Sequence, residues 1–220
     1  MTALRRTLAV AGLGLLAACG NGTNDAAKLL AQLPAALSGE KQQEARVTPQ
    51  QLAQALGATD ASVHLYEIEE RKAQFLMFDI QRNGPYQSFG ASSRQVIVMR
   101  DGMIVSTRGF GGDLMSSEED ALISLVKARQ AGSAQYVQRF LTSDNQTRVV
   151  GYSCIVAPAG GMQVTVGLID EPAQTVNAKC SGPGGTFSNT FVVAHDGYIL
   201  SARQWMGEVI GYMATQAIRR

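Results

Sequence analysis

The sequence predicts a mainly β protein of the α+β class, in which an antiparallel sheet forms a half-barrel or a sandwich from two similar β-units. Two observations predict this fold. Beyond Ser62, runs rich in Val, Ile, Phe, Tyr and Thr alternate with clusters of Gly, Asn, Asp and Pro, as in a chain of short strands. In addition, residues 98–113 resemble residues 193–208, which indicates a duplicated β-unit.

A short helix is expected at the entrance to the domain. Thr48 suits the N-cap and Pro49 the first helical position, and the helical pattern continues to Gly57. Strands should then follow one another along the chain. The predicted strands are 63–69, 73–81, 86–89, 95–100 and 103–110, followed by 148–157, 162–169, 174–179, 190–195 and 198–205.

A second helix is expected near residues 117–131. The run from Ser116 to Glu119 has the features of a capped, acidic first turn. The apolar stripe of this helix consists of Leu122, Ile123, Leu125 and Val126. Residues 133–145 would lead onward as a crossover. Residues 48–220 are therefore predicted to be a single domain, whose halves, about 62–115 and 146–210, are joined by this helix.

Both copies of the repeat have the sequence of a β-hairpin. Asp101-Gly102 and Asp196-Gly197 suit a two-residue type I′ turn, in which both central residues need positive φ. We therefore expect the same hairpin twice.

Each hairpin ends in an Arg-x-aromatic sequence. Strand alternation predicts that Arg108 shares a face with Phe110, and that Arg203 shares a face with Trp205. Aromatic rings beside hydrogen-bond donors suit sugar binding, so these four are candidate binding residues. The alternative, which we favour, is that the two rings close the halves of the core and the arginine stems cover them.

The N-terminus has the layout of a secretory signal. Arg5 and Arg6 precede an apolar run from Leu8 to Leu16, which is too short to span a bilayer. The run ends in Leu16-Ala17-Ala18-Cys19, which resembles a bacterial lipobox. An ordinary signal peptide with a chance cysteine is the less favoured alternative.

A lipobox implies that Cys19 becomes the lipidated first residue of the mature protein. Residues 1–18 would then be a signal peptide, and residues 19–47, rich in Ala, Gln, Asn and Gly, a tether. Two or three acyl chains anchor a protein firmly in a membrane. Gly20, rather than aspartate, favours the outer membrane, with the protein facing the periplasm.

Charge and cysteine content exclude some classes of protein. The net charge of +1 includes Arg5 and Arg6, so the mature chain is near −1 and no nucleic-acid partner is expected. Cys154 and Cys180 remain as a pair in an oxidising compartment, and a disulfide is the leading interpretation. Two buried free thiols or a redox pair are the alternatives.

Motifs that would indicate an enzyme are missing from the sequence. It contains no Gly-x-Ser-x-Gly, no His-Glu-x-x-His and no phosphate-binding Gly-x-x-x-x-Gly-Lys. Of the two histidines, His64 and His195, the latter precedes a turn and is expected to be solvated rather than a ligand. We therefore predict no catalytic residues, no metal ligands and no cofactor.

Several segments together resemble the YjbF/GfcB family of capsule and exopolysaccharide-operon lipoproteins. They are Val96 to Gly102, Gly112-Asp113-Leu114, Ser201 to Gly207 and Gly211-Tyr212. The resemblance covers nearly all of the mature chain. It implies an outer-membrane lipoprotein without known catalytic activity that takes part in production or export of a surface polysaccharide.

Two functional hypotheses follow from this resemblance and from the residues. In the first, the protein binds polysaccharide or export-machinery proteins through its sheet face and the two Arg-x-aromatic sequences. In the second, a half-barrel carries or chaperones an apolar or lipid-linked ligand. A continuous cavity lined by Leu, Ile, Phe and Met would favour the carrier, and a filled core with exposed aromatic side chains the binding role.

Overall fold

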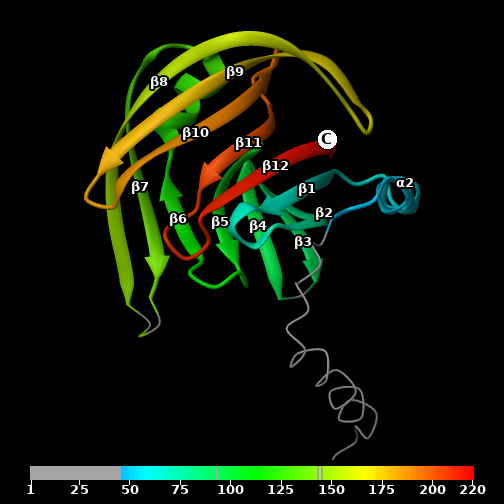
Figure 1. Cartoon of the computed structure of the whole chain (residues 1–220), viewed down its shortest axis with the longest axis horizontal. Coiled ribbons are helices and arrows are strands. Elements are labelled where there is room, and N and C mark those ends of the chain that lie inside the picture. Colours follow the sequence, from blue (N-terminus) through cyan, green and yellow to red (C-terminus); the bar gives the residue numbers. More distant parts are fainter. Residues whose placement is uncertain (1–45, 93, 143, 145) are drawn as a thin grey trace, which may run out of the picture. The chain divides into compact units, whose positions relative to one another are not determined.

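The computed structural model describes residues 46–92, 94–142, 144 and 146–220, which form one twelve-stranded antiparallel sheet that curls into a nearly closed barrel (Figure 1). The predicted class is confirmed. The strands are β1 (Val63–Ile68), β2 (Ala73–Asn83), β3 (Tyr86–Ser92), β4 (Gln95–Arg100), β5 (Met103–Arg108), β6 (Leu114–Glu118), β7 (Gly132–Leu141), β8 (Thr147–Val166), β9 (Ile169–Gly182), β10 (Gly185–Ala194), β11 (Ile199–Trp205) and β12 (Tyr212–Arg219). The helices are α2 (Pro49–Ala58), the 3₁₀ turn η1 (Glu69–Arg71) and α3 (Asp120–Ala128). The predicted signal peptide, Cys19 and nearly all of the tether lie outside the described residues.

The strands follow a simple order around the barrel, β5-β4-β3-β2-β1-β12-β11-β10-β9-β8-β7-β6. Neighbours in the sheet are neighbours in sequence, except that β1 pairs with β12. The first and last described strands therefore meet in the middle of the sheet. The two edges are β5 and β6, which are consecutive in the chain.

Side chains, rather than a backbone ladder, connect the two edge strands along this seam. The Ser106 hydroxyl donates to the carbonyl oxygen of Met115 at 2.9 Å. The single proton of the Ser117 hydroxyl is shared between the Glu119 carboxylate at 2.8 Å and the Val105 carbonyl oxygen at 3.3 Å. These bonds satisfy backbone acceptors that an open sheet edge would leave to solvent. Serine hydroxyl groups thus link the two edge strands of the barrel.

The N-terminal helix forms where it was predicted. The Thr48 hydroxyl accepts from the backbone N–H of Gln51 at 3.2 Å, and the Gln51 side chain accepts from the N–H of Thr48 at 2.8 Å. With Pro49 at the start, this is a complete capping box.

The predicted start of the second helix is wrong by several residues. Ser116 and Ser117 belong to β6, and α3 begins only at Asp120. The serines look like caps in sequence, but the Ser117 hydroxyl lies against the Glu119 carboxylate and the Val105 carbonyl of β5 instead. The predicted crossover 133–145 is also wrong, because most of it is strand β7.

The predicted strands 148–157 and 162–169 are largely one long strand, β8. A register shift between Pro158 and Gly161 bends this strand without ending it. The chain reverses only at Gly167, where φ is 58°. The tip then folds onto the end of β12, where the N–H of Leu168 donates to the carbonyl of Ile218 at 2.8 Å. The β8–β9 hairpin therefore arches over its neighbours (Figure 1).

The two repeated hairpins differ at their turns. Asp101 and Gly102 have φ of 48° and 88°, as a type I′ turn requires, and Arg100 pairs with Met103. In the second copy the N–H of Ala194 donates to the carbonyl of Tyr198, and only Gly197 within the loop has positive φ. The expected two-residue turn is therefore wrong there, since one more residue enters the loop.

The buried apolar side chains of the described barrel form three clusters. Within the largest, Cys154 of β8 and Cys180 of β9 lie directly opposite each other and form a disulfide. The leading interpretation of the two cysteines is confirmed. Both are fully buried, so the bond links the long hairpin at its inner face.

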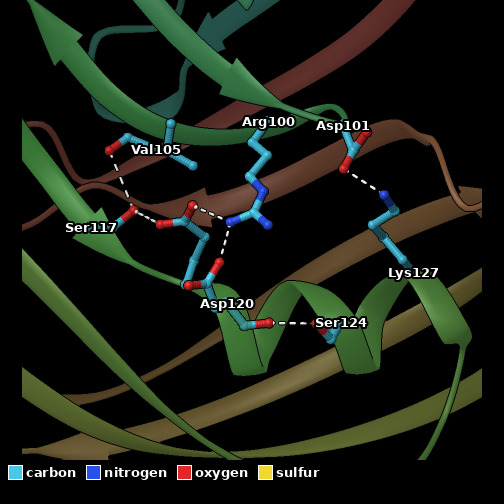
Figure 2. Close-up of polar contacts among 8 residues, drawn as sticks. Arg100, Asp101, Val105, Ser117, Asp120, Ser124 and Lys127 are labelled. Carbon is cyan, nitrogen blue, oxygen red and sulfur yellow. Dashed lines mark hydrogen bonds and ion pairs between the residues drawn. The ribbon is translucent and has the colours of Figure 1, made fainter. Parts of the chain in front are cut away.

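Charged side chains attach α3 to the β4–β5 hairpin, as Figure 2 shows. The Arg100 guanidinium donates to Glu119 and Asp120 at the start of the helix. Near the other end, the Lys127 ammonium lies 2.5 Å from a carboxylate oxygen of Asp101. Glu119 is only 3% exposed, so Arg100 compensates a buried charge. The helix is thereby held at both ends against one turn.

Candidate functional site

A cavity of about 590 Å³ opens where β7 ends, β8 begins and β11 runs into its turn toward β12. Its size is in the range of small-molecule sites. The cavity is lined by Gly112, Asp113, Phe140, Leu141, Thr142, Arg148, Val150, Tyr152, Gly184, Trp205, Gly207, Glu208 and Val209. Trp205 is the one candidate binding residue from the sequence that belongs to this lining.

Two glycines allow the cavity walls to approach each other. At Gly207, where φ is 89°, a Cβ atom would lie 2.8 Å from the Phe140 ring. At Gly184 a Cβ atom would lie 2.3 Å from the hydroxyl oxygen of Tyr152. Side chains at these positions would force the turns outward. The glycines therefore define the shape of the site.

Trp205 is held by both its backbone and its ring. Its backbone N–H donates to the Asn189 side-chain oxygen at 2.8 Å, and its backbone carbonyl accepts from the Gln138 side-chain amide at 3.0 Å. The ring packs against Phe187 and Tyr212, with centroid distances of 6.1 and 5.1 Å. The indole is thus only partly buried yet fixed in position beside the cavity.

Arg203 interacts with residues other than Trp205. Its guanidinium donates two hydrogen bonds of 2.7 Å to the carboxylate of Glu69, and it lies 3.4 Å from the centre of the Tyr212 ring. The Glu69 hydrogen bonds raise the pKa of Arg203. This side chain supports Tyr212, which in turn packs against Trp205.

Arg108 and Phe110 are separated, against the expectation that they share a face. Strand β5 ends at Arg108, and Gly109 has φ of 87°, so strand alternation stops there. Arg108 is exposed, whereas Phe110 is 4% exposed and stacks on Phe75. Phe110 is therefore a core residue, and a binding role for Arg108 stays a prediction.

The cavity offers two polar groups that are not committed to strong interactions. Tyr152 is 3% exposed, and its hydroxyl makes no hydrogen bond to any described residue. Burial raises the pKa of this hydroxyl, which remains a proton donor at neutral pH. Arg148 lies 3.6 Å from Glu208, and both side chains are more than half exposed.

Asp113, by contrast, is fully engaged within its own loop. Its carboxylate accepts from the backbone N–H groups of Gly109 and Phe110 at 2.8 and 3.0 Å, and from the Thr107 hydroxyl at 3.1 Å. This carboxylate orders the β5–β6 connection rather than facing a ligand.

The two histidines lie away from this cavity. His64 is 1% exposed, and its Nε2 lies 3.2 Å from the Tyr198 hydroxyl. His195 is exposed and borders a second, smaller hollow between α3 and the hairpin turns. In the part of the chain that the structure describes, no three His, Cys, Asp or Glu side chains gather as a metal site.

Comparison with known proteins decides the family. Residues 27–218 match the family model described as group 4 capsule polysaccharide lipoprotein GfcB, YjbF. The chain belongs to this family. The resemblance inferred from the sequence is therefore confirmed, and it extends over almost all of the YjbF-type body and part of the predicted tether.

A crystal structure of the hypothetical lipoprotein YmcC from Escherichia coli K12 has a similar fold. The TM-score is 0.67 over 78% of this YjbF-family chain and 90% of YmcC, at 14% sequence identity. At this identity the likeness shows the fold alone. No curated protein is detectably similar in sequence.

Most residues that line the cavity of this YjbF-family protein were not predicted as binding residues from the sequence. Arg148, Val150 and Tyr152 occupy alternate positions of β8, so strand alternation could have placed them on one face. Phe140 and Glu208 carried no such signal, since their contacts depend on how β7 and the β11–β12 turn meet.

Among the described residues, no helix is long and apolar enough to cross a membrane.

Proposed function

We propose that this protein is an outer-membrane lipoprotein, anchored through lipidated Cys19 and facing the periplasm, that acts in production or export of a capsule or exopolysaccharide. It acts by binding polysaccharide or export-machinery proteins and performs no catalysis. The chain belongs to a family described as capsule polysaccharide lipoproteins, which supports this role. The lipobox supports the anchor.

The observation that carries the binding role is the cavity beside Trp205. It combines aromatic rings with an uncommitted hydroxyl and an exposed Arg148–Glu208 pair. Sugars present apolar C–H faces and many hydroxyls, so a site for them needs both kinds of group. No other described cavity contains a tryptophan, because the chain has only one.

Carriage of an apolar or lipid-linked ligand is the second candidate function. The apolar side chains of Leu141, Val150 and Val209 in the cavity favour it. The buried apolar side chains of the barrel, however, pack against one another in three clusters, and the cavity borders the largest of them at Val150, Tyr152 and Trp205. An aromatic cavity with uncommitted polar groups fits the binding role better.

Deletion of the gene tests this function most directly. Surface and secreted polysaccharide should fall, wild-type protein should restore them, and Cys19→Ser should fail to do so. Trp205→Ala should also fail while the protein remains abundant and folded, with Trp205→Phe as the conservative control. Unchanged polysaccharide in the deletion strain would refute the proposal.

A further inference from the structure

We propose that the cavity beside Trp205 binds an acidic sugar residue, with the sugar ring against Trp205 and its carboxylate on Arg148. This inference rests on the proposed function and names the ligand class for its site. It follows from which polar groups in the cavity are free to bind.

The polar groups available to a ligand are mainly donors. Arg148 presents five N–H groups and makes no hydrogen bond to a described residue, and the hydroxyl of Tyr152 is equally free. Of the two carboxylates in the lining, that of Asp113 already accepts three hydrogen bonds, and that of Glu208 faces Arg148. A ligand rich in acceptors is therefore favoured.

Glu208 marks the place of the ligand carboxylate. Its nearest oxygen lies 3.6 Å from the Arg148 guanidinium, a loose ion pair in which the side chains are 52% and 68% exposed. Such exposed pairs contribute little stability. Arginine binds carboxylates best through two parallel hydrogen bonds, which Glu208 does not make here. An incoming carboxylate can thus displace Glu208, which acts as an internal competitor.

The apolar part of the lining fits the other side of a sugar ring. Trp205 is held rigidly, and Leu141 and Val209 at the mouth are 43% and 65% exposed. These surfaces suit the C–H faces of a pyranose. An acyl chain in the same place would bury the hydroxyl of Tyr152 without a hydrogen-bond partner, which is unfavourable.

The single tryptophan makes the site directly observable. Because Trp205 is the only tryptophan in the chain, its fluorescence reports on this cavity alone. The full lipidated chain in phosphatidylcholine vesicles would be titrated with trimers of galacturonate and of mannuronate. The fully methyl-esterified trimers, which keep the rings and lose the charge, are the matched probes, and palmitate represents an apolar ligand.

We expect a saturable change in emission with an acid trimer and at least tenfold weaker binding of its ester. Arg148→Gln should reduce the affinity for the acid to that for the ester, and Glu208→Gln should raise it severalfold. Arg82→Gln, an exposed arginine paired with Asp79 on β2, is the control and should change nothing. Added salt should weaken binding of the acid only.

Three results would overturn the inference. They are equal binding of acid and ester, a response to palmitate alone, and no response to either acid trimer. Each is independent of the deletion experiment. A deletion strain that loses its polysaccharide while the trimers fail to bind would keep the proposed function and remove only this ligand class.

Discussion

The backbone N–H of Ile199 donates a 2.9 Å hydrogen bond to the carbonyl of Asp101, so the turn of the first repeated hairpin rests on β11 of the second. Gly102 makes this contact possible, because a Cβ atom there would lie 2.1 Å from the Ile199 carbonyl oxygen. The two copies of the repeat are therefore joined turn to strand.

Gly102→Ala should destabilise the protein by about 2 kcal/mol or more, because it adds this clash to the strain of a φ of 88°. Urea unfolding measures the change. Gly84→Ala is the control, since its φ is also positive but nothing lies within 4 Å of the added Cβ. It should cost only about 1 kcal/mol. Equal effects would show that strain alone matters.

Ser117→Ala should weaken the barrel seam. It removes the hydroxyl that lies 2.8 Å from the buried Glu119 carboxylate and 3.3 Å from the Val105 carbonyl, and it should cost about 1 kcal/mol. Amide hydrogen exchange in β5 and β6 should accelerate more than exchange in β9 and β10. Ser124→Ala, which removes an exposed bond to Asp120 within α3, serves as control and should leave the seam unchanged. Uniform acceleration throughout the sheet would contradict a local seam.

Stability should fall as pH drops from about 6.5 toward 4, because of His64. Burial lowers its pKa from 6.5 to about 4, so the unfolded chain binds a proton in this range and the folded chain does not. The loss approaches about 3 kcal/mol below pH 4. In His64→Gln the pH dependence in this window should largely vanish, whereas in His195→Gln, at an exposed position, it should persist. Identical pH profiles for wild type and His64→Gln would be inconsistent with this account.

Removal of the disulfide should lower stability by about 3 kcal/mol, the value expected for a loop of 26 residues. The double variant Cys154→Ala/Cys180→Ala avoids a new unpaired thiol and can be compared with reduced wild type in urea. Thiol titration of denatured, unreduced protein provides the chemical check. Detection of two reactive thiols would disprove the bond.

Local signals explain which elements the sequence could predict. Strands β1, β4 and β11 are composed mostly of apolar and aromatic residues, and α2 has a full capping box. Strand β7 was missed because a buried polar residue, Gln138, interrupts its inner face, and β12 because that face carries the small or polar residues Thr215 and Ala217. In both strands these residues are buried by packing against distant parts of the chain. The sequence of a short segment does not contain that information.

The sequence by itself determined the β class, the N-terminal helix, the pairing of Cys154 with Cys180 and the resemblance to the YjbF/GfcB family. These depend on neighbouring residues, on a count of cysteines, or on motifs. Only the tertiary structure decided that β1 pairs with β12, that hydroxyl groups close the seam, and that Trp205 meets Arg148 and Tyr152 at one cavity. Curvature of the whole sheet creates those contacts, and curvature is the sum of register, bulges and turns over the entire barrel.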